Sequence, residues 1–155
     1  DNQIIEEHEI KIKPERLDNA DPVAFKINKY SAGDWVGASA KDEARKLLWQ
    51  KLFCPTLGDY KQEINAVVIA GHNIGFDLLF LAQFFADGNL TFMPRHIIDT
   101  YSLSKHLLAK DGIVLESYGL RGLCQYYGIE NEAAHTALSD TKACLEVYKK
   151  LLNLP

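Results

Sequence analysis

The sequence lacks the features that mark several common protein classes. No apolar run reaches the length of a membrane-spanning helix, and no signal peptide opens the chain. The three cysteines, Cys54, Cys124 and Cys144, are widely spaced and form no C-x-x-C pair, which argues against a disulfide framework and against a zinc site. We therefore expect a protein of the reducing cytoplasm that does not associate with membranes.

Basic charge is also scarce, since 17 Lys and Arg residues stand against 21 Asp and Glu residues and the net charge is −4. This balance argues against binding nucleic acid through a broad basic surface. It still permits a site in which bound metal ions supply the positive charge. With 155 residues, 47% of them hydrophobic, the chain has the size and composition of one globular domain covering residues 1–155.

Strand and helix patterns alternate in the second half of the chain, which predicts an α/β fold with at least part of its sheet parallel. The pattern predicts strands at residues 4–13, 67–69 and 96–98. It predicts helices at residues 39–53, where a capping-box pattern opens the helix, and then at residues 74–86, 100–108, 117–127 and 136–152.

The most informative stretch, VVIAGHNIGFDLLFLAQFF, covers residues 67–85. Its β-branched start predicts a strand buried on both faces, which turns at Gly71 into a helix that is apolar nearly all round. Asn73 is expected to cap this helix, so Asp77 falls in its first turn. A lone carboxylate in such a helix costs several kcal/mol unless donors, a proton or a cation compensate it. Asp77 is therefore predicted either to cap its own helix end or to face a bound metal.

A second acidic residue repeats this situation at the start of the last helix. In the segment HTALSD, residues 135–140, the helical period puts Asp140 on the same side as Ala143 and Val147, away from the lysine-rich face. Converging carboxylates repel each other unless they share a proton or bind a divalent cation. His135, in the loop before the helix, can act as a general base near neutral pH. These residues predict a catalytic metal site more readily than two independent helix caps.

At these two segments the sequence resembles the DEDDh 3′–5′ exonucleases of the ribonuclease H-like fold, which include polymerase proofreading exonucleases and ribonuclease T. His72–Asp77 resembles the second motif of that family, and His135–Asp140 resembles its third. Weaker matches follow the family order at residues 13–28, at Asp99-Thr100 and at residues 117–128. The resemblance implies a mixed sheet flanked by helices.

The resemblance also implies an activity, namely removal of nucleoside monophosphates from the 3′ end of DNA or RNA with two divalent ions, Mg²⁺ or Mn²⁺. By position, Asp140 would bind the metal that activates the attacking water, Asp77 would serve the second metal, and His135 would take the proton. Asn73 would contact the terminal nucleotide, unless it only caps its helix. The implied partners are a nucleic-acid 3′ end and a polymerase or replication complex.

One part of the family pattern is not found. The first motif, an Asp-x-Glu on the first strand, supplies the carboxylates that hold the metals most directly. The nearest match is Glu7-His8-Glu9, whose spacing would put both carboxylates on one face of a strand. It begins with Glu and continues into Lys11 and Lys13, so it is better explained as a solvated strand face.

The missing motif leads to an expectation about the domain. We expect its first two strands to lie upstream of Asp1, so that residues 1–155 form an N-terminally incomplete exonuclease-like domain that folds poorly by itself. The alternative is a noncatalytic nucleic-acid-binding or protein-interaction module on the same scaffold.

Overall fold

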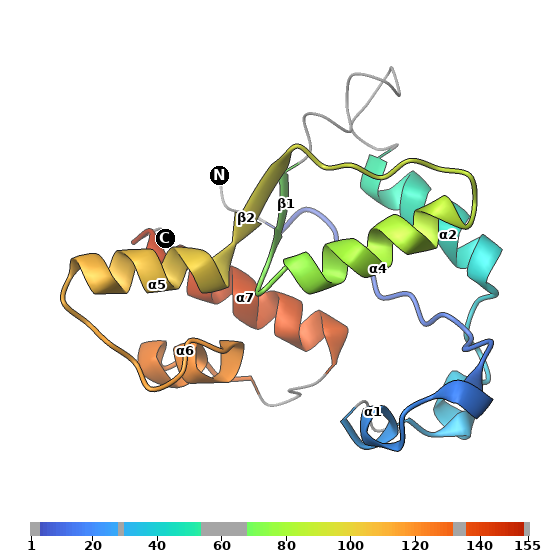
Figure 1. The fold of residues 1–155 in the computed structure, drawn as a ribbon, viewed down its shortest axis with the longest axis horizontal. Coiled ribbons are helices and arrows are strands. Elements are labelled where there is room, and N and C mark those ends of the chain that lie inside the picture. Colours follow the sequence, from blue (N-terminus) through green and yellow to red (C-terminus); the bar gives the residue numbers. More distant parts are fainter. Residues whose placement is uncertain (1–3, 28–29, 54–67, 132–135, 154–155) are drawn as a thin grey trace.

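The computed structural model describes residues 4–27, 30–53, 68–131 and 136–153. Its first half contains two 3-10 helices, η1 (Leu17–Asn19) and η2 (Ala32–Trp35), and two α-helices, α1 (Pro22–Ile27) and α2 (Lys41–Phe53). Its second half contains β1 (Val68–Gly71), α4 (Gly75–Ala86), β2 (His96–Asp99), α5 (Thr100–Lys110), α6 (Leu120–Tyr127) and α7 (Ala137–Leu151). The predicted α/β class is confirmed (Figure 1).

The two strands form a parallel pair, as predicted, and their register runs from Val68 opposite His96 to Gly71 opposite Asp99. Both strands therefore end at the same edge of the sheet, where α4 and α5 begin (Figure 1). The prediction that β1 is buried on both faces is wrong, because exposed and half-buried residues alternate along it and Val68 is 50% exposed. The sheet of the described residues has only two strands, which leaves much of β1 uncovered.

The main hydrophobic core lies among α5, α6 and α7. Leu108, Leu123 and Val147, one from each helix, are all at most 5% exposed. The inward face predicted for the last helix is confirmed, since Ala143, Cys144, Val147 and Leu151 are its buried residues. Thr136 caps this helix by accepting a hydrogen bond from the Ser139 amide, so its predicted start is correct.

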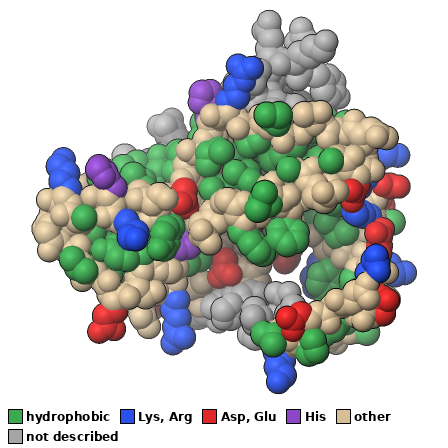
Figure 2. All heavy atoms as spheres, in the orientation of Figure 1, with side chains coloured by type: hydrophobic (Ala, Val, Ile, Leu, Met, Phe, Trp, Pro, Cys, Tyr) green, Lys and Arg blue, Asp and Glu red, His purple; other side chains and the backbone are tan. Residues whose placement is uncertain are grey.

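Helix α4 differs from its prediction. It was expected to be buried nearly all round, but Phe76, Leu79 and Phe80 are 63%, 72% and 63% exposed. Hydrophobic side chains gather along this helix on the face shown in Figure 2. Only its far end is deeply packed, where Phe85 meets Trp49 of α2 edge to face with ring centroids 5.3 Å apart. The hydrophobic pattern correctly predicted a helix here, but the described neighbouring elements cover only part of its surface.

The strand predicted at residues 4–13 is wrong. Within the part of the chain that the structure describes, this segment forms only an isolated parallel bridge, between Ile12 and Ser39. In this bridge the Lys13 amide donates to the Ser39 carbonyl and the Ser39 amide to the Lys11 carbonyl, both at 2.9 Å. A strand pattern becomes a sheet strand only when another strand pairs with it. Glu7 is exposed and its carboxylate lies 2.8 Å from Lys142 Nζ, in agreement with the prediction of a solvated face.

One predicted helix cap and one predicted helix start are also wrong. Asn73 does not cap α4: the capping position is Ile74, no side chain caps the helix, and Asn73 lies in the turn before it with φ of 55°. Asn tolerates this left-handed conformation better than most residues. The helix predicted at residues 117–127 begins only at Leu120, with Gly119 at its capping position. The predicted end of α6 is correct, because Gly128 adopts φ of 65° just after Tyr127.

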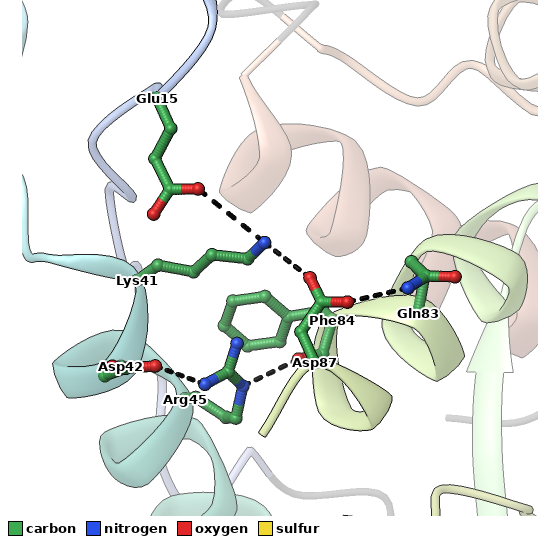
Figure 3. A network of polar contacts seen from close by, with 7 residues as sticks. All are labelled: Glu15, Lys41, Asp42, Arg45, Gln83, Phe84 and Asp87. Carbon is green, nitrogen blue, oxygen red and sulfur yellow. Dashed lines mark hydrogen bonds and ion pairs between the residues drawn. The ribbon is translucent and has the colours of Figure 1, made fainter. Parts of the chain in front are cut away.

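A network of polar contacts joins α2 to the end of α4 (Figure 3). Lys41 Nζ lies 2.5 Å from Asp87 Oδ2, and Gln83 Nε2 donates to the other oxygen of Asp87 at 2.6 Å. Arg45, only 6% exposed, donates from Nε to the Phe84 carbonyl at 2.6 Å and forms an ion pair with Asp42. Its guanidinium lies over the Phe84 ring, 5.0 Å from the centroid. These contacts fix where α4 lies against α2.

Within the described ranges, no helix is both long enough and apolar enough to cross a membrane.

Candidate functional site

The candidate site lies where β1 and β2 end. Because Gly71 pairs with Asp99, the turn after β1 is next to the first residues of α5. Helix α7 contacts both β1 and α5, so a third helix packs against these two elements. The carboxyl ends of parallel strands are where α/β proteins generally place ligand-binding residues.

Asp99 is the acceptor at the centre of this edge. One of its oxygens accepts from the backbone amides of Asn73, at 2.7 Å, and Tyr101, at 3.3 Å. The other accepts from the amide of Ser102 at 3.3 Å and from its hydroxyl at 2.6 Å. Partial burial by itself raises the pKa of Asp99, but the hydrogen bonds from Ser102, Asn73 and Tyr101 outweigh it and hold the pKa below its ordinary value. Asp99 is therefore a stable carboxylate that caps α5 and holds the turn before α4.

Thr100 is the second central residue, and it is fully buried. Its hydroxyl donates to the Gly71 carbonyl at 3.1 Å. The same oxygen lies 3.0 Å from His72 Nδ1 and 3.4 Å from Cys144 Sγ. One hydroxyl thus connects the end of β1, the turn after it, and α7.

His72 lies half-buried between these elements, and its ring meets the Tyr101 ring edge to face with centroids 5.9 Å apart. Burial lowers the pKa of His72 below its ordinary value, and the nearby charge of Asp99 offsets part of this effect. The neutral imidazole is consequently favoured near neutral pH.

Cys144 is a core residue of α7, being 8% exposed and not in a disulfide. Burial raises the pKa of Cys144, the hydrogen bond between it and Thr100 lowers it, and the charges of Asp99 and Asp77 raise it further. Burial likewise raises the pKa of Cys124, with a further contribution from the charge of Asp140. The charge of Asp77 thus contributes to the raised pKa of Cys144, and the charge of Asp140 to that of Cys124.

The predicted site residues differ in their burial and in their hydrogen-bond partners. Asp77 lies in the first turn of α4, as predicted, but it is exposed rather than surrounded by apolar side chains. Asp140 lies in the first turn of α7, is half-buried and accepts a hydrogen bond from Asn131 Nδ2 at 2.9 Å. Asn73 is exposed, and its amide is bound to Asp99. His135 lies outside the described residues.

The described residues do not by themselves form a metal centre. Among them, no group of three or more His, Cys, Asp or Glu side chains is placed to hold a metal ion. Asp77 and Asp140 carry carboxylates, a type of group that suits Mg²⁺. Two carboxylates are fewer than an all-protein site requires, so further oxygen ligands are needed.

Sequence reasoning missed the roles of Asp99, Thr100 and Asn131. Asp99 and Thr100 entered only as a family match, although polar residues at the end of a parallel strand are a signal for a site. Asn131 carries no such signal. Its amide is oriented by the Ser139 hydroxyl, which donates to its Oδ1 and leaves Nδ2 for Asp140.

Comparison with known proteins is consistent with this geometry. A family model described as exonuclease, that of RNase T, matches residues 1–148. DNA polymerase III subunit epsilon of Treponema pallidum is 26% identical over 100 residues, which cover 64% of this chain and 46% of that protein. The 3′–5′ exonuclease DinG of Staphylococcus aureus is 31% identical over 97 residues, or 60% of this chain and 10% of that protein. The match over almost the whole chain, together with an α/β architecture that fits a ribonuclease H-like fold, shows that the chain belongs to the RNase T exonuclease family.

Proposed function

We propose that this protein is a metal-dependent 3′–5′ exonuclease that releases nucleoside monophosphates from the 3′ end of DNA or RNA. The family match over residues 1–148 is the observation that carries this proposal. Two relatives are named as a DNA polymerase III subunit and as a 3′–5′ exonuclease, and the second name supports the direction of degradation. The first of these names also supports a polymerase as partner of this protein.

Asp77, Asp140 and His135 are the proposed catalytic residues. Asp140 is held in place by Asn131, and Asp77 is exposed and therefore accessible to ions and substrate. Asp77 and Asp140 would contribute oxygens to two ions, Mg²⁺ or Mn²⁺, and His135 would accept the proton of the attacking water. Bound ions of this kind make water a better nucleophile and stabilise charge on the phosphate. Substrate phosphate and carboxylates other than those described would complete the ligand set.

Asn73 is proposed to contact the terminal nucleotide. Its amide is engaged by Asp99, but its side chain does not cap α4, and the residue is exposed at the end of the parallel strands. This arrangement supports a binding role for Asn73 over the capping role that the sequence also allowed.

The test uses 5′-labelled DNA and RNA oligonucleotides incubated with the purified protein and Mg²⁺ or Mn²⁺. We expect products that shorten one nucleotide at a time from the 3′ end, with release of mononucleotides, and no reaction in the presence of a chelator. Asp140→Asn should abolish the reaction, Asp77→Asn should reduce it strongly, and His135→Ala should reduce it about 10²- to 10⁴-fold. Asp111→Asn, at an exposed residue at the end of α5, is the matched control and should leave the rate unchanged.

Two results would contradict the proposal. Internal cleavage, or shortening from the 5′ end, would assign a different nuclease activity. Binding of 3′ ends without release of mononucleotides under any metal condition would instead favour a noncatalytic nucleic-acid-binding module.

A further inference from the structure

We propose that Thr100 fixes His72 in the tautomer protonated at Nδ1, so that the unprotonated Nε2 accepts a hydrogen bond from the 3′-hydroxyl of the bound nucleic acid. The recognition of this hydroxyl rests on the proposed function. The assignment of the tautomer rests on the structure and is tested separately.

The proton count at Thr100 carries the tautomer assignment. A threonine hydroxyl has one proton to donate and two lone pairs to accept with. The Gly71 carbonyl, 3.1 Å away, only accepts, so it takes the Thr100 proton. His72 Nδ1 at 3.0 Å and the Cys144 thiol at 3.4 Å must then both donate to the Thr100 oxygen. This assignment satisfies all of these contacts at once.

The opposite assignment leaves a conflict inside the protein. If Thr100 donated its proton to His72 Nδ1, its oxygen and the Gly71 carbonyl oxygen would face each other as two acceptors 3.1 Å apart. Thr100 is fully buried, so water cannot relieve this contact. Leaving a buried acceptor unsatisfied costs about 1–3 kcal/mol, enough to favour one tautomer strongly.

Nε2 is the nitrogen left for a ligand. His72 is half-buried, its Nδ1 is taken by Thr100, and within the described ranges Nε2 has no hydrogen-bond partner. Burial lowers the pKa of His72, so the neutral ring keeps its lone pair on Nε2 near neutral pH. The residue comes directly after β1, at the strand ends where Asp99 and Asn73 also lie.

A hydrogen-bond acceptor at this place could recognise a group that is present at the 3′ end of a nucleic acid and absent from its interior. The terminal 3′-oxygen carries a proton that it can donate, whereas each internal 3′-oxygen is esterified to phosphate. A fixed imidazole acceptor at the strand ends would therefore favour chain ends over internal positions.

The tautomer is measured by long-range ¹H–¹⁵N NMR correlation on the full chain, which distinguishes the two ring nitrogens of a histidine. We expect His72 to be protonated at Nδ1 in the unsubstituted protein and in Thr100→Ser, which keeps the hydroxyl. In Thr100→Val the fixing contact is lost and the Nε2-protonated form should appear. Protonation at Nε2 in the unsubstituted protein would overturn the assignment, even if Thr100→Val fails to fold.

Recognition of the hydroxyl is measured by comparing oligonucleotides that end in a 3′-hydroxyl with matched 3′-deoxy ends. His72→Phe should raise KM for the hydroxyl-ended substrate roughly two- to tenfold, the loss of one hydrogen bond, and leave the 3′-deoxy substrate unaffected. His72→Gln, whose amide oxygen still accepts, should restore part of the difference. His106→Phe, at an exposed position of α5, is the control.

The outcomes separate the two proposals. If His72→Phe affects both substrates equally, His72 does not read the hydroxyl. If neither substrate is degraded, the proposed exonuclease function fails, whereas the NMR result still decides the tautomer.

Discussion

The backbone amide of Asn73 donates to Oδ1 of Asp99 at a distance of 2.7 Å, although the two residues are 26 positions apart in the chain. This bond joins the turn after β1 to the end of β2. The same carboxylate caps α5 through Tyr101 and Ser102. Asp99 therefore sets the relative position of the two helices that begin at the candidate site.

Replacing Asp99 with asparagine should lower the free energy of unfolding by about 1–3 kcal/mol, because an amide has one acceptor oxygen for donors that now bind a charged carboxylate. The pKa of Asp99 is lower in the folded state than its ordinary value of 3.8. The ionised carboxylate therefore stabilises the folded state fully above that ordinary pKa, and this stabilisation is lost as the pH falls through the lower folded pKa. Urea unfolding at pH 7 measures the effect. Asp18→Asn, at an exposed position of η1, is the control and should change stability little.

His72 should make the protein less stable as the solution is acidified. The pKa of His72 is lowered in the folded state. Below the ordinary pKa of 6.5, His72 is therefore protonated in the unfolded chain while it is still neutral in the folded protein. The free energy of unfolding should therefore fall as the pH drops below about 6.5, until His72 also becomes protonated in the folded protein.

This contribution is isolated by comparing variants in urea at pH 7.5, 6.5 and 5.5. His72→Gln should show a smaller loss of stability on acidification than the unsubstituted protein. His106→Gln, at an exposed histidine of α5, should retain the original dependence. An unchanged slope in His72→Gln would show that other groups cause the pH dependence.

Gly88→Ala should destabilise the junction of α2 and α4 by about 1–3 kcal/mol. A Cβ at Gly88 would lie 2.8 Å from Arg45 Nε and 2.9 Å from its Nη1, so Arg45 would have to give up its bond to the Phe84 carbonyl. Thermal unfolding measures the effect, and Gly37→Ala, where no atom lies within 4 Å of the added Cβ, is the control. In an Arg45→Ala background, the cost of Gly88→Ala should largely disappear.

Asn131→Ala should weaken the metal dependence of the proposed exonuclease without abolishing folding. The Asn131 amide holds Asp140 at 2.9 Å, and removing a partner that orients a metal ligand typically costs about 10- to 100-fold in metal affinity or activity. The measurement is the Mg²⁺ or Mn²⁺ concentration at half-maximal mononucleotide release. Gln125→Ala, at an exposed position of α6, is the control, and equal metal dependence in both variants would exclude this role for Asn131.

Local patterns predicted much of the second half of the chain. The helical period identified the buried side of α7 that carries Ala143 and Val147, and Gly128 marked the end of α6 because its φ of 65° suits glycine. The same reasoning put Asp77 in the first turn of α4. These features depend on residues a few positions apart, which is why they can be read without the fold.

Burial was predicted less well, because it depends on which elements pack together. The apolar pattern of residues 67–85 indicated a fully covered strand and helix, but Phe76 and Leu79 are exposed. The alternating pattern of residues 4–13 indicated a strand, but the described chain offers it only one bridge, at Ile12. The hydrophobic pattern of a segment shows which side chains it can bury, but the elements that pack against the segment determine which side chains are buried.

The sequence by itself determined the α/β class, the parallel strand pair, and the membership of the exonuclease family. Only the tertiary structure decided that Asp99 holds the turn at Asn73 and that Thr100 connects Gly71, His72 and Cys144. The physical reason is that hydrogen bonds between residues 26 to 44 positions apart exist only once the strands have paired and α7 has packed against them.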